Sequence, residues 1–189
     1  MPTTTLVLAR HGETDWNAVG RWQGHADPPL NDVGRAQAAT LAAALAETSF
    51  DAAYSSDLQR ARETAAIVAG RLGLVVTERV DLREIDVGSW SGLTRAEVAA
   101  RFPEGYARWL SGTIGHDGET SEQLTDRVVG ALLRVAAAHP GGTILVVTHG
   151  GAIRAARRHA TGAPGEPLPN CAMETLVVRE GRLQGASAG

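Results

Sequence analysis

The chain has 189 residues, of which 43% are apolar and 21% are charged, and its formal net charge is −3. These values are typical of one globular domain spanning 1–189, and the charge gives no reason to expect nucleic acid or a membrane as a partner. The single cysteine, Cys171, excludes a disulfide framework and a cysteine-based metal cluster. The chain has no signal-peptide pattern and no apolar run approaching the roughly 20 residues that cross a bilayer, so a cytoplasmic location is expected.

The first half of the chain alternates short apolar runs with helical patterns. Residues 3–9 form an apolar run rich in β-forming residues, which predicts a buried strand that stops at Arg10, His11 and Gly12. A long loop at 12–30 carries too many large side chains to be a disordered linker. The remaining predicted elements of this half are a helix at 32–47 capped by Asn31 or Asp32, a strand at 50–55, a helix ending at Leu72 and capped by Ser56 or Asp57, a strand at 75–80 and an extended segment to Gly88.

The second half begins with an irregular, lid-like insertion at about 88–118, in which we expect two short helices at 94–101 and 104–110. A helix opens at 118–121 and reaches about residue 138, and a clean buried strand at 143–148 ends on His149. A helix to about 161 and a hairpin of strands at 173–178 and 182–184 complete the chain. This order predicts an α/β three-layer sandwich with a mostly parallel central sheet flanked by helices.

Two predicted strands therefore end in histidine, one in His11 and the other in His149. The carboxyl ends of parallel strands lie at the same edge of a sheet, and Arg10 and the first-turn residue Arg60 belong to that edge as well. Two arginines, two histidines and helix N-termini together favour an anion, and a phosphate dianion is the natural guest. No Asp and His cluster at ligand spacing is found, so neither a metal nor another cofactor is expected.

The residues around this edge resemble the histidine phosphatase superfamily, which is also called the phosphoglycerate mutase-like family. The resemblance starts at Arg10-His11-Gly12-Glu13-Thr14 and recurs in the family's order along nearly the whole chain. The further matching segments are Arg21-Trp22-Gln23-Gly24-His25, Ser55-Ser56-Asp57-Leu58-Gln59-Arg60-Ala61, Glu84-Ile85-Asp86-Val87-Gly88, Gly118-Glu119-Thr120-Ser121 and Val147-Thr148-His149-Gly150-Gly151.

The resemblance implies a role for each matching side chain. His11 would be the nucleophile that takes the phosphoryl group, and Glu84 would be the general acid and then the general base. Because Glu84 must start protonated, activity is expected to favour the acidic side of neutral. The implied phosphate-binding residues are Arg10, Asn17, Arg60 and His149, and the candidate substrate-binding residues are Trp22, Gln23, Gly24 and Gly150.

The family contains phosphatases and mutases, and the resemblance implies a phosphatase. The mutases carry a longer insertion with an adjacent arginine pair after a tryptophan, whereas here the comparable segment is Trp109-Leu110-Ser111. A metal-independent phosphomonoesterase acting on a small phosphorylated metabolite is therefore expected. The alternatives are a bisphosphoglycerate-dependent mutase and a catalytically silent binding module, although the module would be expected to have lost the site residues. The sequence also allows a homodimer.

Overall fold

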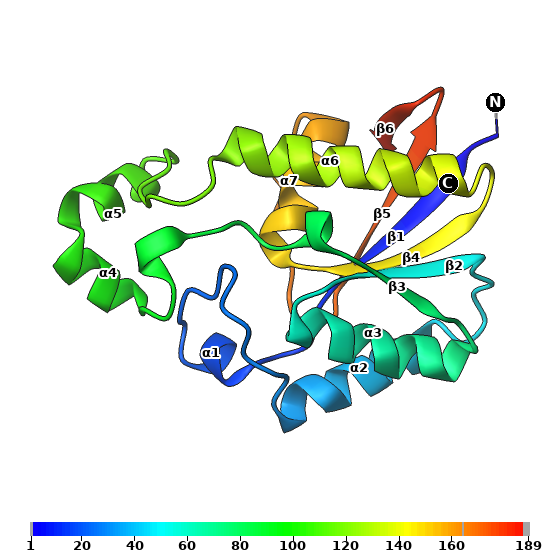
Figure 1. The fold of residues 1–189 in the computed structure, drawn as a ribbon, viewed down its shortest axis with the longest axis horizontal. Coiled ribbons are helices and arrows are strands. Elements are labelled where there is room, and N and C mark those ends of the chain that lie inside the picture. The colour runs from blue at the N-terminus through cyan, green and yellow to red at the C-terminus, as the bar shows by residue number, and fades with distance from the viewer. Residues whose placement is uncertain (1, 164, 187–189) are drawn as a thin grey trace.

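A six-stranded sheet organises the computed structural model, which describes residues 2–163 and 165–186. The strand order is β3-β2-β4-β1-β5-β6, and the first four of these strands are parallel (Figure 1). Strand β5 runs antiparallel to β1, and β6 runs antiparallel to β5. The strands are β1 (Thr4–Arg10), β2 (Ala52–Ser56), β3 (Val76–Arg79), β4 (Thr143–Thr148), β5 (Met173–Arg179) and β6 (Arg182–Gly185).

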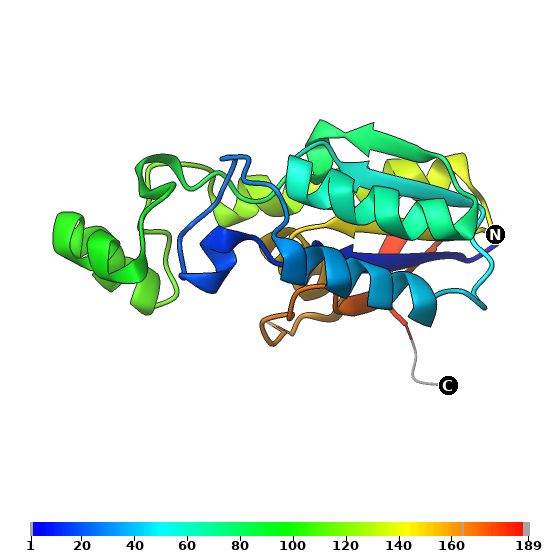
Figure 2. The same ribbon diagram turned by 90° about the horizontal axis from the view of Figure 1, so that it is seen from below.

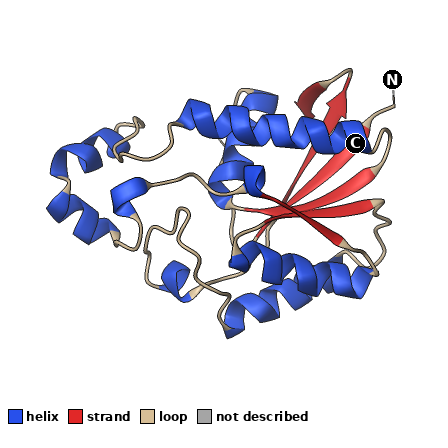
Figure 3. Ribbon diagram, in the orientation of Figure 1, coloured by secondary structure: helices blue, strands red, loops and turns tan. Residues whose placement is uncertain are grey.

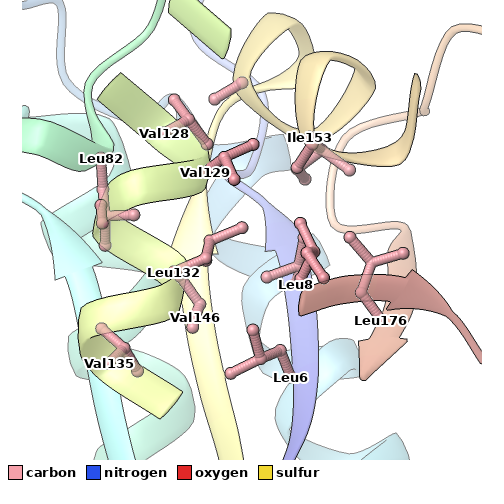
Figure 4. Close-up of a cluster of buried hydrophobic side chains, with 14 of the residues drawn as sticks. Leu6, Leu8, Leu82, Val128, Val129, Leu132, Val135, Val146, Ile153 and Leu176 are labelled. Carbon is pink, nitrogen blue, oxygen red and sulfur yellow. The ribbon is translucent and has the colours of Figure 1, made fainter. Parts of the chain in front are cut away.

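Helices cover both faces of this sheet, which confirms the predicted α/β architecture (Figure 3). Helices α2 (Asp32–Ala44) and α3 (Gln59–Leu72) lie on one face, and α6 (Ser121–Ala138) and α7 (Gly150–Thr161) lie on the other. The central strands are apolar on both faces because each face is buried under helices. Figure 4 shows the core between the sheet, α6 and α7, where Leu8, Leu132 and Val146 are about 1% exposed or less. None of the described helices is long and apolar enough to cross a membrane.

The start of α3 corrects the predicted N-cap. The cap residue is Leu58, whose side chain makes no capping bond, rather than Ser56 or Asp57. The Asp57 carboxylate instead accepts two hydrogen bonds from the guanidinium of Arg83. The free backbone N–H of Gln59 donates to the carboxylate of Asp27, at 2.6 Å. A residue distant in sequence therefore caps this helix, which local sequence patterns do not reveal.

Two other predicted elements differ in the structure. The segment after β3 is not extended throughout, because Val80–Leu82 forms a 3₁₀ turn that buries Leu82. The guanidinium of Arg79 donates twice to the carboxylate of Asp81 and supports this turn. The loop at 12–30 contains a short helix, α1 (Asp15–Ala18), which Thr14 caps.

The predicted lid-like segment projects beyond the end of the sheet (Figures 1 and 2). It contains a 3₁₀ turn at Gly88–Trp90 and the two expected short helices, α4 (Arg95–Arg101) and α5 (Pro103–Leu110). Trp90 is 1% exposed, and the ring of Trp22 lies edge-on against it at 5.4 Å between centroids. An apolar cluster of its own therefore holds this segment over the carboxyl ends of the strands.

Candidate active site

Strands β1 and β4 bring the two predicted histidines together. Arg10 lies opposite Thr148 in the parallel register, so the next residue of each strand emerges at the same level. The backbone N–H of His11 donates to the carbonyl of Thr148 at 3.0 Å. The ring centroids of His11 and His149 are 5.2 Å apart, with the rings edge to face. The structure therefore places His11 and His149 together at one edge of the sheet, as expected.

The geometry around His11 leaves one ring nitrogen available. The ring is 3% exposed, and its Nδ1 lies 2.7 Å from the carbonyl oxygen of Gly12. Because a carbonyl only accepts, Nδ1 carries the proton and Nε2 keeps a free lone pair. Burial, followed by the charges of Arg60 and Arg10, lowers the pKa of His11 well below its ordinary value of 6.5. His11 is therefore neutral at physiological pH.

Arg60 is the second residue of α3 and is fully buried. Its two terminal nitrogens donate to the carbonyls of Ala26 and Gly24, at 2.7 and 2.9 Å, respectively. Burial lowers the pKa of Arg60 to about 10, so the guanidinium still carries its charge at neutral pH. The loop carbonyls hold this guanidinium while its Nε remains free for another acceptor.

Several buried polar nitrogen atoms at this edge have no hydrogen-bond partner within the described ranges. They are Nε of Arg10, Nε of Arg60 and both ring nitrogens of His149. Leaving a buried polar group unpaired costs about 1–3 kcal/mol, so a cluster of such groups points to a missing acceptor. Two of these side chains are cations, and burial followed by the charge of Arg60 holds the pKa of His149 well below 6.5. A phosphate group would supply the acceptor oxygens and the negative charge that this cluster lacks.

Glu84 lies across the site, just after the 3₁₀ turn at Val80–Leu82. Its two carboxylate oxygens accept hydrogen bonds from the backbone N–H groups of Ile85 and Gly151, each at 2.9 Å. The Glu84 charge raises the pKa of both Arg10 and Arg60 against the larger lowering effect of burial. The carboxylate is thus fixed by two backbone donors and faces the cationic side of the site.

A half-buried guanidinium supports the segment that carries Glu84. Arg127 of α6 donates to the carbonyls of Arg83 and Glu84, at 2.9 and 3.2 Å. The same guanidinium donates twice to the carboxylate of Glu119, at 2.8 and 2.6 Å. His25 contributes a further contact through Nε2, which lies 2.9 Å from the Glu84 carbonyl oxygen. Sequence reasoning missed Arg127, since nothing in a helical pattern marks one arginine as the support of a distant backbone.

A cavity of about 370 Å³ opens at this cluster, and we name it the inner cavity. Most of the residues predicted from the sequence line it, but Gly150 and His149 do not, although the ring centroid of His149 lies 5.2 Å from that of His11. The inner cavity is also lined by residues that the sequence analysis did not predict for the site, among them Arg21, Arg95, Gly151 and Arg154. The predicted residues in its wall are Arg10, His11, Asn17, Trp22, Gln23, Gly24, Arg60 and Glu84.

Asn17 lines the inner cavity. Its Oδ1 accepts a hydrogen bond from the backbone N–H of Thr14, at 3.2 Å, as part of the capping box of α1. Nδ2 of Asn170 donates to the carbonyl of His11 at 3.0 Å and to the same Oδ1 of Asn17 at 3.4 Å. With Oδ1 occupied in this way, the Nδ2 group of Asn17 is the donor left for a ligand.

Trp22 both packs in the lid cluster and lines the inner cavity. Its ring lies edge-on to that of Trp109, with centroids 5.3 Å apart. Its buried indole N–H has no acceptor in the part of the chain that the structure describes. The predicted substrate-binding residue Trp22 therefore has a packing contact in the lid as well as a place in the cavity wall.

The donor set does not suit a metal ion. Arginine guanidinium groups are not metal ligands, and the buried imidazoles lie beside two of them. Across residues 2–163 and 165–186, no group of three or more His, Cys, Asp or Glu side chains is arranged to hold a metal ion. The charge and hydrogen-bonding capacity of the site match an oxyanion instead.

Replacing Gly151 by alanine is expected to lower kcat by about 10–100-fold, because a misplacement of about 1 Å in a catalytic group has effects of this size. A Cβ at Gly151 would overlap Oε1 of Glu84, which is the flexible end of a side chain and would have to move. Gly150→Ala is the matched control, since its Cβ would meet Arg10 at an ordinary 3.4 Å. Equal activities for the two variants in a phosphate-release assay would show that the position of Glu84 is unimportant.

Sequence comparisons identify relatives of this chain. The sequence profile described as "Histidine phosphatase superfamily (branch 1)" matches residues 6–186. A metal-independent phosphoserine phosphatase from Arabidopsis thaliana is 43% identical over 184 residues, covering 94% of this chain and 77% of that protein.

The solved structures that resemble this chain include a phosphatase and a phosphoglycerate mutase. A mycobacterial glucosyl-3-phosphoglycerate phosphatase, solved as a complex with VO3, superimposes with a TM-score of 0.82 at 31% identity, covering 91% of this chain and 90% of its own. A phosphoglycerate mutase from Bacillus anthracis has a TM-score of 0.88 at 26% identity, covering 99% of this chain and 93% of its own. The profile match over nearly the whole chain, and relatives that are named phosphatases, support phosphomonoesterase activity. The chain belongs to the histidine phosphatase superfamily.

Proposed function

We propose that this protein hydrolyses phosphomonoesters without a metal ion, through a phosphohistidine intermediate on His11. The observation that carries the proposal is the neutral His11 ring, whose free Nε2 lies among buried cationic donors that have no partner within the described residues. A neutral imidazole is a nucleophile, and fixed positive charge stabilises the phosphoryl group during its transfer.

In the first step, Nε2 of His11 attacks phosphorus and the bond from phosphorus to the ester oxygen breaks. Glu84 gives its proton to the departing oxygen, so that the leaving group departs as an alcohol. Arg10, Arg60, His149 and the amide of Asn17 hold the oxygens of the phosphoryl group in this proposal. The two guanidinium groups also offset its negative charge.

In the second step, water displaces the phosphoryl group from His11. Glu84, now ionised, takes a proton from the water while the oxygen attacks phosphorus and the phosphorus–nitrogen bond breaks. Inorganic phosphate leaves, and His11 returns to its neutral form. The two backbone donors on the Glu84 carboxylate support both roles, because they keep its position constant while its protonation changes.

The experiment that tests this function is phosphate release in the presence of excess chelator. The panel should contain p-nitrophenyl phosphate together with phosphoserine and 3-phosphoglycerate, since the relatives' names suggest small phosphorylated metabolites as substrates. Release that survives the chelator supports a metal-independent phosphatase. Conversion of 3- to 2-phosphoglycerate that depends on 2,3-bisphosphoglycerate would instead establish the mutase alternative.

The proposed roles predict that kcat/KM is higher near about pH 5.5 than near about pH 8. His11 must be neutral to attack, and the lowering of its pKa below 6.5 keeps it neutral as the pH falls through that value. Glu84 must carry a proton at the start, and the protonated fraction of a carboxyl group grows as the pH falls. A rate that climbs steadily above neutral pH would contradict the role of Glu84 as the acid.

A cytoplasmic location and a homodimer remain proposals drawn from the sequence. Cell fractionation tests the first, and the mass measured by light scattering during gel filtration tests the second. A monomer at micromolar concentration would overturn the dimer and leave the proposed chemistry unaffected.

A further inference from the structure

One buried hydroxyl group connects the helix that carries Arg60 to the loop that carries His11. Thr64 lies one turn after Arg60 on α3 and is fully buried. Its Oγ1 donates to the carbonyl of Arg60 at 2.7 Å, as threonines inside helices often do. The same oxygen accepts a hydrogen bond from the backbone N–H of Gly12 at 3.0 Å, across 52 positions of the sequence. This second bond therefore fixes the loop relative to the helix.

Gly12 in turn determines which nitrogen of the His11 ring carries a proton. The carbonyl oxygen of Gly12 lies 2.7 Å from Nδ1 of His11, so it accepts the Nδ1 proton and Nε2 keeps its lone pair. The direction of this carbonyl depends on the backbone of a glycine, which has no Cβ to restrict its dihedral angles. A contact that holds Gly12 therefore also holds the proton of His11 on Nδ1.

The peptide group between His11 and Gly12 is held on both sides. Its carbonyl, which belongs to His11, accepts a hydrogen bond from Nδ2 of Asn170 at 3.0 Å. Its N–H, which belongs to Gly12, donates to the Thr64 hydroxyl. Without that hydroxyl the buried N–H loses this acceptor, which is unfavourable. The peptide group would then tilt and carry the Gly12 carbonyl away from Nδ1.

We propose that Thr64 is a positioning residue for phosphoryl transfer: through Gly12 it holds the proton of His11 on Nδ1, and Nε2 stays free to attack phosphorus. The inference rests on the proposed function and adds a residue to it. Thr64 does not line the inner cavity, so it acts through His11 and not through the substrate. A hydroxyl group with a purely structural role would change stability alone, whereas a positioning role changes the state of the His11 ring as well.

Thr64→Val tests this role, because valine keeps the shape of the side chain and lacks the hydroxyl group. We expect kcat for p-nitrophenyl phosphate to fall by about 10–100-fold, as a small misplacement of a catalytic group produces. The inhibition constant of inorganic phosphate should stay within about threefold of the wild-type value, since the guanidinium groups are unchanged. Thr64→Ser retains the hydroxyl and should recover kcat to within about threefold of the wild type. Where Thr64→Val does not fold, Thr64→Cys, with its weakly hydrogen-bonding thiol, should show a smaller loss in the same direction.

Thr4→Val is the matched control. Thr4 is likewise buried and lies at the opposite end of β1 from His11. Its Oγ1 donates to the carbonyl of His139 and accepts from the backbone N–H of Gly141, each at 3.1 Å. The control variant therefore loses the same pair of hydrogen bonds away from the site. It should lower the melting temperature, as Thr64→Val does, and keep the wild-type kcat.

Isotope-edited NMR of the histidine side chains gives the direct readout, with the His11 signals assigned by their absence from His11→Ala. Wild type and Thr4→Val should show a protonated Nδ1 and an unprotonated Nε2, and Thr64→Val should show a mixture of both tautomers. An unchanged tautomer or a wild-type kcat in folded Thr64→Val, or an equal loss of kcat in Thr4→Val, would overturn the role of Thr64. Phosphate release that depends on His11 would still support the proposed function. A wild-type protein that releases phosphate from no ester of the panel would overturn the proposed function and this inference together.

Discussion

Replacing His11 by alanine is expected to reduce phosphate release by at least about 10⁴-fold, because removing the nucleophile of a covalent mechanism has effects of this order. His11 has a free Nε2, and the charges of Arg60 and Arg10 help to lower the pKa of its ring. The Cys171 thiol is a poor substitute for it, since burial raises the pKa of this thiol to about 11. Initial rates with p-nitrophenyl phosphate in the presence of chelator are the measurement.

His159→Ala is the matched control for this variant, because His159 is an exposed histidine near the end of α7 and lies outside the inner cavity. It should keep wild-type activity. Circular dichroism and thermal unfolding establish that both variants are folded. A folded His11→Ala protein with more than about one-tenth of the wild-type rate would contradict covalent catalysis at this residue.

Glu84→Gln is expected to lower kcat by about 10²–10⁴-fold for esters of ordinary alcohols, the usual range for a lost general acid or base. The glutamine keeps the size of the side chain but cannot give or take the proton. Its amide also places an N–H group against one of the backbone donors, from Ile85 or Gly151, that the carboxylate now accepts. Measuring kcat across alcohols and phenols of decreasing basicity isolates the effect.

The loss in Glu84→Gln should shrink for p-nitrophenyl phosphate, since a good leaving group needs little protonation. For that ester the second step becomes limiting, and phosphorylated enzyme should accumulate. Glu104→Gln, an exposed carboxylate in the first turn of α5, is the control and should leave all rates unchanged. An equal loss for every leaving group, without accumulation, would argue that Glu84 acts only through the structure of the site.

The main features of the fold follow from local sequence patterns. The strand that ends at Arg10 and the strand that ends at His149 are both visible as apolar runs, and the parallel register then sets His11 beside His149. The placement of Arg60 at the same edge follows in the same way, from a helix that begins after β2. These residues could be assigned because a parallel sheet converts strand order into spatial proximity.

The details that fix the side chains depend on contacts between distant segments. Asp27 caps α3 and Arg127 holds the carbonyl of Glu84, yet neither position has a distinctive neighbour in the sequence. The expected contribution of Gly150 to the cavity falls instead to Gly151, because the turn at the start of α7 directs the second glycine toward Glu84. Arg154 was missed for a related reason, since its position on a helix gives no sign of which cavity the helix borders.

Trapping the phosphorylated enzyme tests the central claim most directly. The wild-type protein, with chelator present, is mixed with p-nitrophenyl phosphate, quenched in base within one turnover and digested for peptide mapping. We predict a phosphoryl group that is stable in base, labile in acid and located on the peptide containing His11, with none in His11→Ala. A wild-type protein that releases phosphate under these conditions, while its His11 peptide stays unmodified at every quench time in both wild type and Glu84→Gln, would contradict the phosphohistidine mechanism.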